Sequence, residues 1–283
     1  MSAVVNRAVS TPGTARELRG RWWRFALILL ITAVLLVPIA VVVLLSILPG
    51  ASSTSSGFTF EHFGYVFGQT LAVTWIQNSL ITTLVTVVLA VAVAAPAGYV
   101  LSRGRSRAVS AYSLLLFILQ SLPIITSVVP LFILFADFGL ADSLVGLTIV
   151  YVAATMAVAT WMMAAYFDSI PVSLEEAAWI DGLSVFGSFL RVVLRNSLPG
   201  VLSTAIFAFL LSWNDYLVAL VFLRSDVNFT LPIGVQSFFQ QSSIDWGSVM
   251  ALAVVMMLPP VLIFVALNKY FSISGIGGSL AGR

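Results

Sequence analysis

The chain has 283 residues, of which 60% are hydrophobic and only 8% are charged, and its formal net charge is +2. Soluble domains carry roughly 25% charged residues, so a soluble fold of this size has too little polar surface to cover such a chain, whereas a bilayer accommodates it. The small net charge argues against a nucleic-acid-binding protein, and the absence of cysteine excludes disulfides, thiolate zinc sites and iron–sulfur clusters.

Six apolar runs are long enough to cross a membrane, which takes about 20 mostly apolar residues in a helix. They are residues 25–48, 80–101, 109–135, 144–166, 201–222 and 249–267. Prolines lie inside some of these runs, at Pro38, Pro96, Pro123 and Pro130. We expect kinks rather than breaks at the prolines, because neighbouring helices can bond the carbonyls that they free.

The runs predict an all-α, polytopic membrane protein with six transmembrane helices. An N-terminal segment over residues 1–24 precedes the transmembrane domain, residues 25–270, and a tail over residues 271–283 follows it. The first run is longer than the 7–15 residues of a typical signal-peptide core, so we expect it to be a retained helix.

Basic residues are concentrated on one side of this arrangement. Twelve of the thirteen lysines and arginines lie in the N-terminal segment, in the loops after the second and fourth runs, or at the C-terminal end, and only Arg224 lies on the other side. The positive-inside rule therefore places both termini in the cytoplasm of a bacterial inner-membrane protein. His62, the single histidine, then lies in the first outer loop, where we expect it to be solvated.

The sequence lacks the residues that several kinds of binding and catalysis require. The chain has no G-x-x-x-x-G-K-[ST] motif, since Lys269 is followed by Tyr270, so it has no P-loop for ATP. One histidine and no cysteine leave little for a nucleophilic or metal-centred enzyme. Asp215 is the single acidic residue inside a predicted span, so a two-aspartate protease or a proton relay lacks its other groups. We expect no catalytic residue, metal or cofactor in this chain.

Asp215 belongs to a polar and aromatic group with Trp213, Asn214 and Tyr216 inside the run 201–222. A carboxylate at the centre of a spanning helix costs about 2.5–3.5 kcal/mol on insertion scales. Two interpretations remain open. The group lines a water-filled substrate pathway, where aromatic faces beside hydrogen-bonding groups suit a sugar, or it fixes helix packing through a hydrogen bond.

The loop between the fourth and fifth runs, about residues 167–199, reads DSIPVSLEEAAWIDGLSVFGSFLRVVLRNSLPG. Ser173 stands three residues before Glu176, which is typical of a capping box and predicts a short helix over residues 174–181. Gly182 offers the left-handed position that ends such a helix.

A second helix is predicted after that turn. Ser184 can cap it, its range is 185–194, and its apolar residues form one face with Arg191 and Arg195 away from it. Pro199 then starts the fifth span.

These two helices are predicted to present a surface to another protein on the cytoplasmic side. Ala177 and Ala178 are small enough for a close approach, and Glu175, Glu176 and Asp181 supply polar anchoring. The alternative is an amphipathic loop on the lipid surface, although three carboxylates are poorly suited to an anionic leaflet.

The segment EEAAWIDG and the stretch after it resemble the EAA loop of ABC importer permeases, E-A-A-x3-G-x9-I-x-L-P. Glu176, Ala177, Ala178 and Gly182 match the motif, and Val192 takes the place of the isoleucine. The final Leu-Pro is replaced by leucine and arginine at 194–195. IQNSLITT, GYVLSRGRSR, PLFILFADFGLADS and FLLSWNDYLVAL also look like carbohydrate-uptake, MalG-like permeases, so the resemblance covers most of the chain.

The resemblance implies the ABC importer permease fold and half of a sugar translocation pathway that works by alternating access. It implies as partners a second permease, a dimer of ATPases that bind ATP and magnesium, an extracytoplasmic solute-binding protein and membrane lipid. It also implies that the glycine-rich tail, with Gly275, Gly277 and Gly278, enters the ATPase interface, although chain ends are commonly frayed. The alternatives are an ABC permease for a non-sugar solute and a stand-alone secondary transporter or channel, which would need internal repeats or ion-coupling groups that the sequence does not show.

Overall fold

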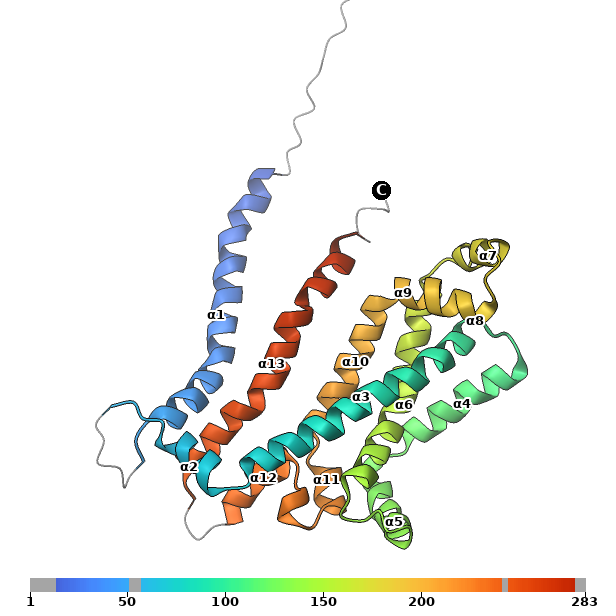
Figure 1. The fold of residues 1–283 in the computed structure, drawn as a ribbon. Helices are drawn as coiled ribbons and strands as arrows, with labels where there is room; N and C mark the ends of the chain where they lie inside the picture. The colour runs from blue at the N-terminus through green and yellow to red at the C-terminus, as the bar shows by residue number, and fades with distance from the viewer. Residues whose placement is uncertain (1–13, 51–56, 241–243, 278–283) are drawn as a thin grey trace, which may run out of the picture.

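The structure, a computed structural model, describes residues 14–50, 57–240 and 244–277, and in these ranges the chain is helical without any strand (Figure 1). The α-helices are α1 (Thr14–Ile47), α2 (Glu61–Gln69), α3 (Ala72–Arg103), α4 (Arg107–Ser121), α5 (Ile124–Asp137), α6 (Leu144–Asp168), α7 (Ser173–Ile180), α8 (Val185–Ser188), α9 (Leu194–Asn196), α10 (Leu198–Trp213), α11 (Leu217–Phe222), α12 (Leu231–Ser237) and α13 (Trp246–Gly277). A π-helix, η1 (Phe189–Val193), and two 3-10 turns, η2 (Asp226–Asn228) and η3 (Phe238–Gln240), complete the described segments.

Four helices are long and apolar enough to cross a membrane without a break. They contain the stretches Trp22–Ile47, Ala72–Arg103, Leu144–Asp168 and Trp246–Leu267. Two bent helix pairs, Arg107–Ser121 with Ile124–Asp137 and Val185–Asn196 with Leu198–Trp213, raise the number to six if each pair crosses as one span. The described chain is therefore the polytopic helical protein that the hydropathy predicts, with two of its spans interrupted.

The expectation that Pro123 only kinks the third span is wrong. The axes of α4 and α5 differ by 94°, and Leu122 between them has the extended dihedrals φ −80° and ψ 121°. A residue before proline is driven from the helical region, because the proline ring clashes with its backbone. By contrast, Pro38, Pro96 and Pro130 stay inside α1, α3 and α5.

The fifth predicted span is interrupted as well. Helix α10 ends at Trp213, and α11 starts only at Leu217, so Asp215 lies in the connection rather than at a helix centre. Asparagine and aspartate side chains compete with the helix for backbone groups, and here the Asn214 amide donates to the carbonyl of Leu210 at 2.8 Å.

The centre of the fold is the contact between α3 and α6. Small residues on α3, among them Ala90 and Ala94, are fully buried, which lets the helix backbones approach closely. A Cβ atom added at Gly98 would lie 2.7 Å from the Cβ of Met163 and 2.9 Å from the backbone nitrogen of Ala164. Glycine at this position therefore sets the closeness of the two helices.

Helices α7, α8 and α9 lie at the same end of the molecule as the start of α1 and the end of α13 (Figure 1). We call this the α7 end. Helices α2, α11 and α12 lie at the opposite end, which we call the α12 end (Figure 1).

The segment between α11 and α13 contains α12, whose first residues Leu231 and Pro232 are buried at the α12 end. The expectation that His62 is solvated is wrong, because its exposed fraction is 7%. Its Nε2 lies 3.0 Å from the carbonyl oxygen of Leu48, and its Nδ1 lies 3.5 Å from an oxygen of Asp245, so it joins α2 to the ends of two other helices.

Candidate functional site

Helix α7 and the turn after it form the first candidate site. The helix covers Ser173–Ile180, close to the predicted range, but the capping box is absent because Ser173 is already helical and Val172 takes the N-cap position without a side-chain bond. Backbone bonds start the helix instead, since the N–H groups of Glu175 and Glu176 both donate to the carbonyl of Val172, at 2.9 and 3.0 Å.

The turn at the other end of α7 has the predicted form. Gly182 has a φ of +89°, a left-handed conformation that side chains disfavour. The hydroxyl of Ser184 then accepts a hydrogen bond from the backbone N–H of Gly187 at 3.1 Å, which is the predicted cap.

The second helix is less regular than predicted. It is divided into α8, η1 and α9, and its apolar face is divided too: Phe189 and Val193 are buried, whereas Val185 and Phe186 are exposed. A π-helix shifts the register by one residue, so one continuous stripe cannot face the bundle along its whole length.

The six predicted residues of this site have two different environments. Glu176, Ala177, Asp181 and Gly182 are exposed, as contact with another protein requires. Glu175 and Ala178 are buried against the rest of the chain. They lie three residues apart and therefore on one face of the helix. Contact of the exposed residues with a partner stays a prediction.

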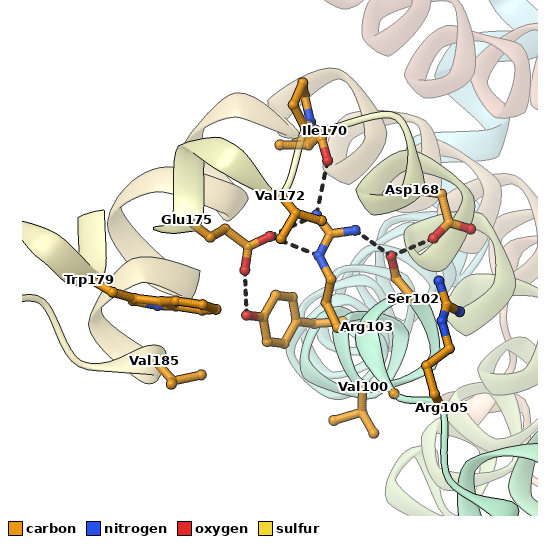
Figure 2. Close-up of a pocket in the computed structure, with 13 residues that line it drawn as sticks. Val100, Ser102, Arg103, Arg105, Asp168, Ile170, Val172, Glu175, Trp179 and Val185 are labelled. Carbon is orange, nitrogen blue, oxygen red and sulfur yellow. Dashed lines mark hydrogen bonds and ion pairs between the residues drawn. The ribbon is translucent and has the colours of Figure 1, made fainter. Parts of the chain in front are cut away.

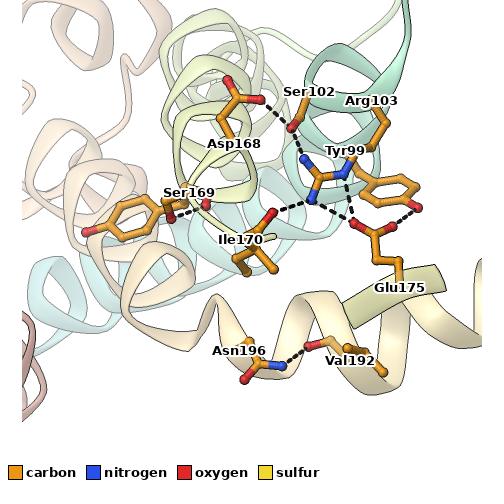
Figure 3. A network of polar contacts seen from close by, with 10 residues as sticks. Tyr99, Ser102, Arg103, Asp168, Ser169, Ile170, Glu175, Val192 and Asn196 are labelled. Carbon is orange, nitrogen blue, oxygen red and sulfur yellow. Dashed lines mark hydrogen bonds and ion pairs between the residues drawn. The ribbon is translucent and has the colours of Figure 1, made fainter. Parts of the chain in front are cut away.

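Glu175 is tied to α3 rather than presented to a partner (Figure 3). Its Oε1 accepts a hydrogen bond from Nε of Arg103 at 2.8 Å and lies 2.7 Å from Nη2 of the same guanidinium. Its Oε2 accepts a hydrogen bond from the hydroxyl of Tyr99 at 2.5 Å. The Glu175 side chain is 1% exposed and that of Arg103 is 19% exposed. Removing one partner of a buried ion pair costs about 3–5 kcal/mol, because the other charge is left unpaired, so loss of the Arg103 guanidinium should disturb the position of α7.

A cavity of about 700 Å³ adjoins this ion pair (Figure 2). Its wall combines the end of α3 with the α6–α7 connection, α7 and Val185 of α8. Trp179 stands on one side of it, and Ser102, Asp168 and Arg105 stand on the other (Figure 2). The cavity therefore lies between α7 and the membrane helices that α7 covers.

Sequence reasoning missed the contribution of α3 to this site. Tyr99 and Arg103 are four residues apart on one helix, so they project from the same face and reach the same carboxylate. That spacing is the one signal in the sequence, and it does not indicate which acidic residue the pair meets.

The second candidate site is the predicted pathway group, and its residues have different environments in the structure. Trp213 is 1% exposed, stacks on Phe209 with ring centroids 5.6 Å apart, and donates its indole N–H to the carbonyl of Met256 at 3.1 Å. It is thus a packing residue between α10 and α13. Asn214 is exposed and Tyr216 is half-buried.

Asp215 makes the kind of interhelical hydrogen bond that the packing interpretation expects. Its Oδ2 accepts from the hydroxyl of Tyr151 on α6 at 2.9 Å and from the backbone N–H of Ala219 at 3.0 Å, so it also caps α11. A role of Asn214 and Tyr216 in a substrate pathway stays a prediction.

The third candidate site is the glycine-rich tail. Gly275 and Gly277 belong to the last turns of α13, so the helix continues past the predicted end of the transmembrane domain. Gly278 and the residues after it lie outside the described residues.

Three comparisons relate this geometry to known proteins. The family model for the "Binding-protein-dependent transport system inner membrane component" matches residues 94–273, which include the end of α3, the whole of α6, α7 and Asp215. The chain is 34% identical over 221 residues to the inner membrane ABC transporter permease protein YcjP of Escherichia coli (strain K12), an alignment that covers 77% of this chain and 79% of YcjP.

A second relative and a solved structure agree with this assignment. The maltodextrin transport system permease protein MdxG of Bacillus subtilis (strain 168) is 31% identical over 223 residues, which cover 78% of this chain and 80% of MdxG. The crystal structure of a bacterial ABC transporter involved in the import of the acidic polysaccharide alginate contains a chain with a TM-score of 0.75 and 25% identity, and the match covers 92% of this chain and 100% of that one.

Proposed function

Because this chain belongs to the family of binding-protein-dependent transport system inner membrane components, we propose that it forms half of the translocation pathway of an ATP-driven sugar importer. The other half is a second, homologous permease. A dimer of ATPases binds ATP and magnesium on the cytoplasmic side, and an extracytoplasmic solute-binding protein delivers the sugar. The chain itself makes and breaks no bonds.

The orientation follows from the distribution of basic residues. The α7 end gathers the start of α1, the end of α13 and the arginines that follow α3, and the positive-inside rule assigns this end to the cytoplasm (Figure 1). Among the described residues, Arg224, at the α12 end, is then the single basic residue on the extracytoplasmic side.

The exposed surface of α7 is the observation that carries the proposal. Leu174, Trp179 and Ile180 are 45%, 40% and 86% exposed, beside the exposed carboxylates of Glu176 and Asp181. Apolar groups beside charges are unsuited to the interior of a bilayer and to water alone, but they suit a protein interface. We assign this surface to the ATPase, so that nucleotide-driven closure of the ATPases moves α7.

Two further contacts belong to the same proposal. The end of α13 and the tail, with Gly275, Gly277 and Gly278, reach the ATPase interface, where glycines allow a close backbone approach. Asn214 and Tyr216 face the translocation pathway, and Asp215 positions them through its bonds to α6 and α11.

The sugar class rests on relatives of the chain. MdxG is named as a maltodextrin permease, and the structure with the TM-score of 0.75 belongs to an importer of the polysaccharide alginate. The scarcity of charge inside the predicted spans favours a neutral sugar, such as a maltodextrin, over an acidic one, such as alginate. We therefore propose a di- or oligosaccharide.

Co-purification followed by reconstitution tests the proposal. The tagged chain should bring down a second permease and an ATPase from its own cells, and proteoliposomes with the binding protein should take up a labelled oligosaccharide only when ATP is present. Glu176→Lys should lose the ATPase, whereas Arg105→Gln, away from the exposed face of α7, should keep it. Purification without any ATPase, together with ATP-independent uptake, would instead identify a stand-alone transporter.

A further inference from the structure

The guanidinium of Arg103 joins three separate segments (Figure 3). It pairs with Glu175 on α7, its Nη2 donates to the carbonyl of Ile170 at 3.1 Å, and its Nη1 donates to the hydroxyl of Ser102 at 3.0 Å. The Ser102 hydroxyl in turn donates to Asp168 at the end of α6, at 2.5 Å. One side chain therefore holds the end of α3, the α6–α7 connection and α7 together.

This link is the polar connection between α7 and α3. The backbone of α7 packs on α8 and η1, which follow it in the chain, while α3 reaches it through the side chains of Tyr99 and Arg103. A polar path from α7 to α3 therefore runs through the Glu175 carboxylate. Beside it, an apolar path runs through η1, where Phe189 contacts the ring of Tyr99 with the ring centroids 4.9 Å apart. The adjoining cavity of about 700 Å³ leaves room for α7 to shift while this link persists (Figure 2).

The other end of α3 holds a second segment, residues 226–231, at the α12 end. The indole of Trp75 donates to the carbonyl of Asp226 at 2.8 Å, and the Asn78 amide donates to the carbonyls of Val227 and Phe229, both at 2.9 Å. The backbone N–H of Leu231 donates to the hydroxyl of Ser79 at 2.7 Å.

Helix α3 thus has buried polar attachments at both ends. Asn78 is 7% exposed and Ser79 is 2% exposed, so water does not compete for these bonds. At 1.5 Å per residue, the distance along the helix from Asn78 to Arg103 is about 38 Å. Helix α3 therefore spans the molecule from α7 to the segment 226–231.

We propose that Arg103 is a positioning residue that carries the displacement of α7 into α3, and that α3 delivers it to residues 226–231 on the extracytoplasmic side. The proposal rests on the proposed function, because the ATPases supply the displacement. It differs from a general role of the loop in binding the ATPase, since it assigns the transmission to one side chain and predicts movement at a distant segment.

A single introduced thiol tests the transmission in the assembled importer. The chain has no cysteine, and Val227 is 58% exposed, so Val227→Cys creates one reactive site at the far end of α3. Its maleimide labelling rate is measured on the permease band, with and without ATP and vanadate. We expect a difference of about fivefold or more between the two states, the lower range of allosteric coupling. Adding Arg103→Gln should abolish that difference and the uptake, while the ATPase is retained and still hydrolyses ATP.

Further variants separate transmission from folding of the loop. Tyr99→Phe removes only the hydroxyl on Glu175 and should lower the solute transported per ATP hydrolysed. Arg103→Glu combined with Glu175→Arg restores the pair in reverse and should recover part of the uptake. Arg105→Gln, in the same cavity wall, is the matched control and should leave the coupling ratio unchanged.

The outcomes distinguish this proposal from the proposed function. If the natural chain binds no ATPase, the proposed function itself fails. If the natural chain transports normally but Arg103→Gln keeps both its uptake and its nucleotide-dependent labelling, the transmission proposal is overturned. Loss of the ATPase from Arg103→Gln and from Tyr99→Phe would overturn it as well, because the network would then serve only to fold the docking loop.

Discussion

Asp142 clamps two connections at the α12 end, and its replacement offers a sharp test of the structure. Its Oδ1 accepts hydrogen bonds from the backbone N–H groups of Arg224 and Ser225 at 2.8 and 3.1 Å, and the Ser225 hydroxyl donates to Oδ2. Its own backbone N–H donates to the carbonyl of Phe222 at 2.9 Å, and its carbonyl accepts from the Asn228 amide at 2.7 Å. Asp142 also has a φ of +50°, which is left-handed.

The cost of a substitution follows from these two features. Hydrogen bonds to a charged group contribute about 1.5–3 kcal/mol each, and the lower value applies to this half-buried carboxylate, so the loss of two backbone bonds costs about 3 kcal/mol. Alanine adds about 1–2 kcal/mol of left-handed strain, which asparagine tolerates and glycine avoids. We expect a loss of about 4–5 kcal/mol in Asp142→Ala, about 3 in Asp142→Gly and about 1 in Asp142→Asn.

Low pH should reproduce part of the loss of stability that is expected for the Asp142 variants. Burial favours the neutral acid, but the hydrogen bonds from Arg224, Ser225 and Asn228 outweigh it and lower the pKa of Asp142 from 3.8 to about 2. Because the pKa of Asp142 is lower in the folded chain than in the unfolded chain, the carboxylate stabilises the fold fully above the unfolded pKa. This stabilisation is lost as the pH falls from about 4 towards 2. Asp142→Asn has no carboxylate to take up a proton in this range, so its unfolding should lack this pH dependence.

The assay is the thermal unfolding midpoint of the purified complex in detergent at pH 7 and pH 3, with intact assembly before heating as the control. At pH 7 the unfolding midpoint should decrease from the natural chain through Asp142→Asn and Asp142→Gly to Asp142→Ala. At pH 3 the difference in midpoint between the natural chain and Asp142→Asn should be smaller. Equal unfolding midpoints for Asp142→Gly and Asp142→Ala would contradict the left-handed strain expected for alanine at this position. An Asp142→Ala complex as stable as the natural one would refute the clamp.

Three further predictions concern other parts of the fold. Gly98→Leu should separate α3 from α6 and destabilise the chain by about 1–3 kcal/mol or more in detergent unfolding, whereas Gly64→Ala, with open space around it, should be neutral. Gly182→Val should strain the turn after α7 by about 1–3 kcal/mol and lose the ATPase in pull-down, while Gly182→Asn should keep it. Burial favours the neutral form of Asp245, but hydrogen bonds from Ser248 and Gly247 and the charge of His62 outweigh burial and lower the pKa of Asp245. The junction of α2 with α13 should therefore resist proteolysis at neutral pH and lose this protection in acid. Asp245→Asn should not show this dependence on pH.

The membrane organisation was predictable because it depends on composition over long windows. Runs of about 20 apolar residues identify helices without any knowledge of their neighbours. Helices α3, α6 and α13 contain the corresponding predicted runs, and α1 contains the first run except Leu48. Local turn chemistry was equally accessible at Gly182 and Ser184, since each acts within a few residues of itself.

The interruptions of the third and fifth predicted spans were not predictable, because they depend on contacts with residues distant in the sequence. Pro96 and Pro123 look alike in sequence, yet the first stays inside α3 and the second separates α4 from α5. His62 was expected in solvent because a loop histidine usually has no burial partner nearby in sequence. Its partners, Leu48 and Asp245, come from the ends of distant helices.

The two adjacent glutamates of α7 show where sequence reasoning stops. Successive helical residues point about 100° apart, so Glu175 and Glu176 cannot both face the bundle or both face a partner. The period pairs Glu175 with Ala178, but it does not decide which face turns inward. The decision comes from Arg103, 72 residues earlier in the chain, whose guanidinium meets Glu175 and not its neighbour. Of the two glutamates, Glu176 is therefore the one left outside, where it is available with Asp181 to a partner, while Glu175 holds α7 to α3.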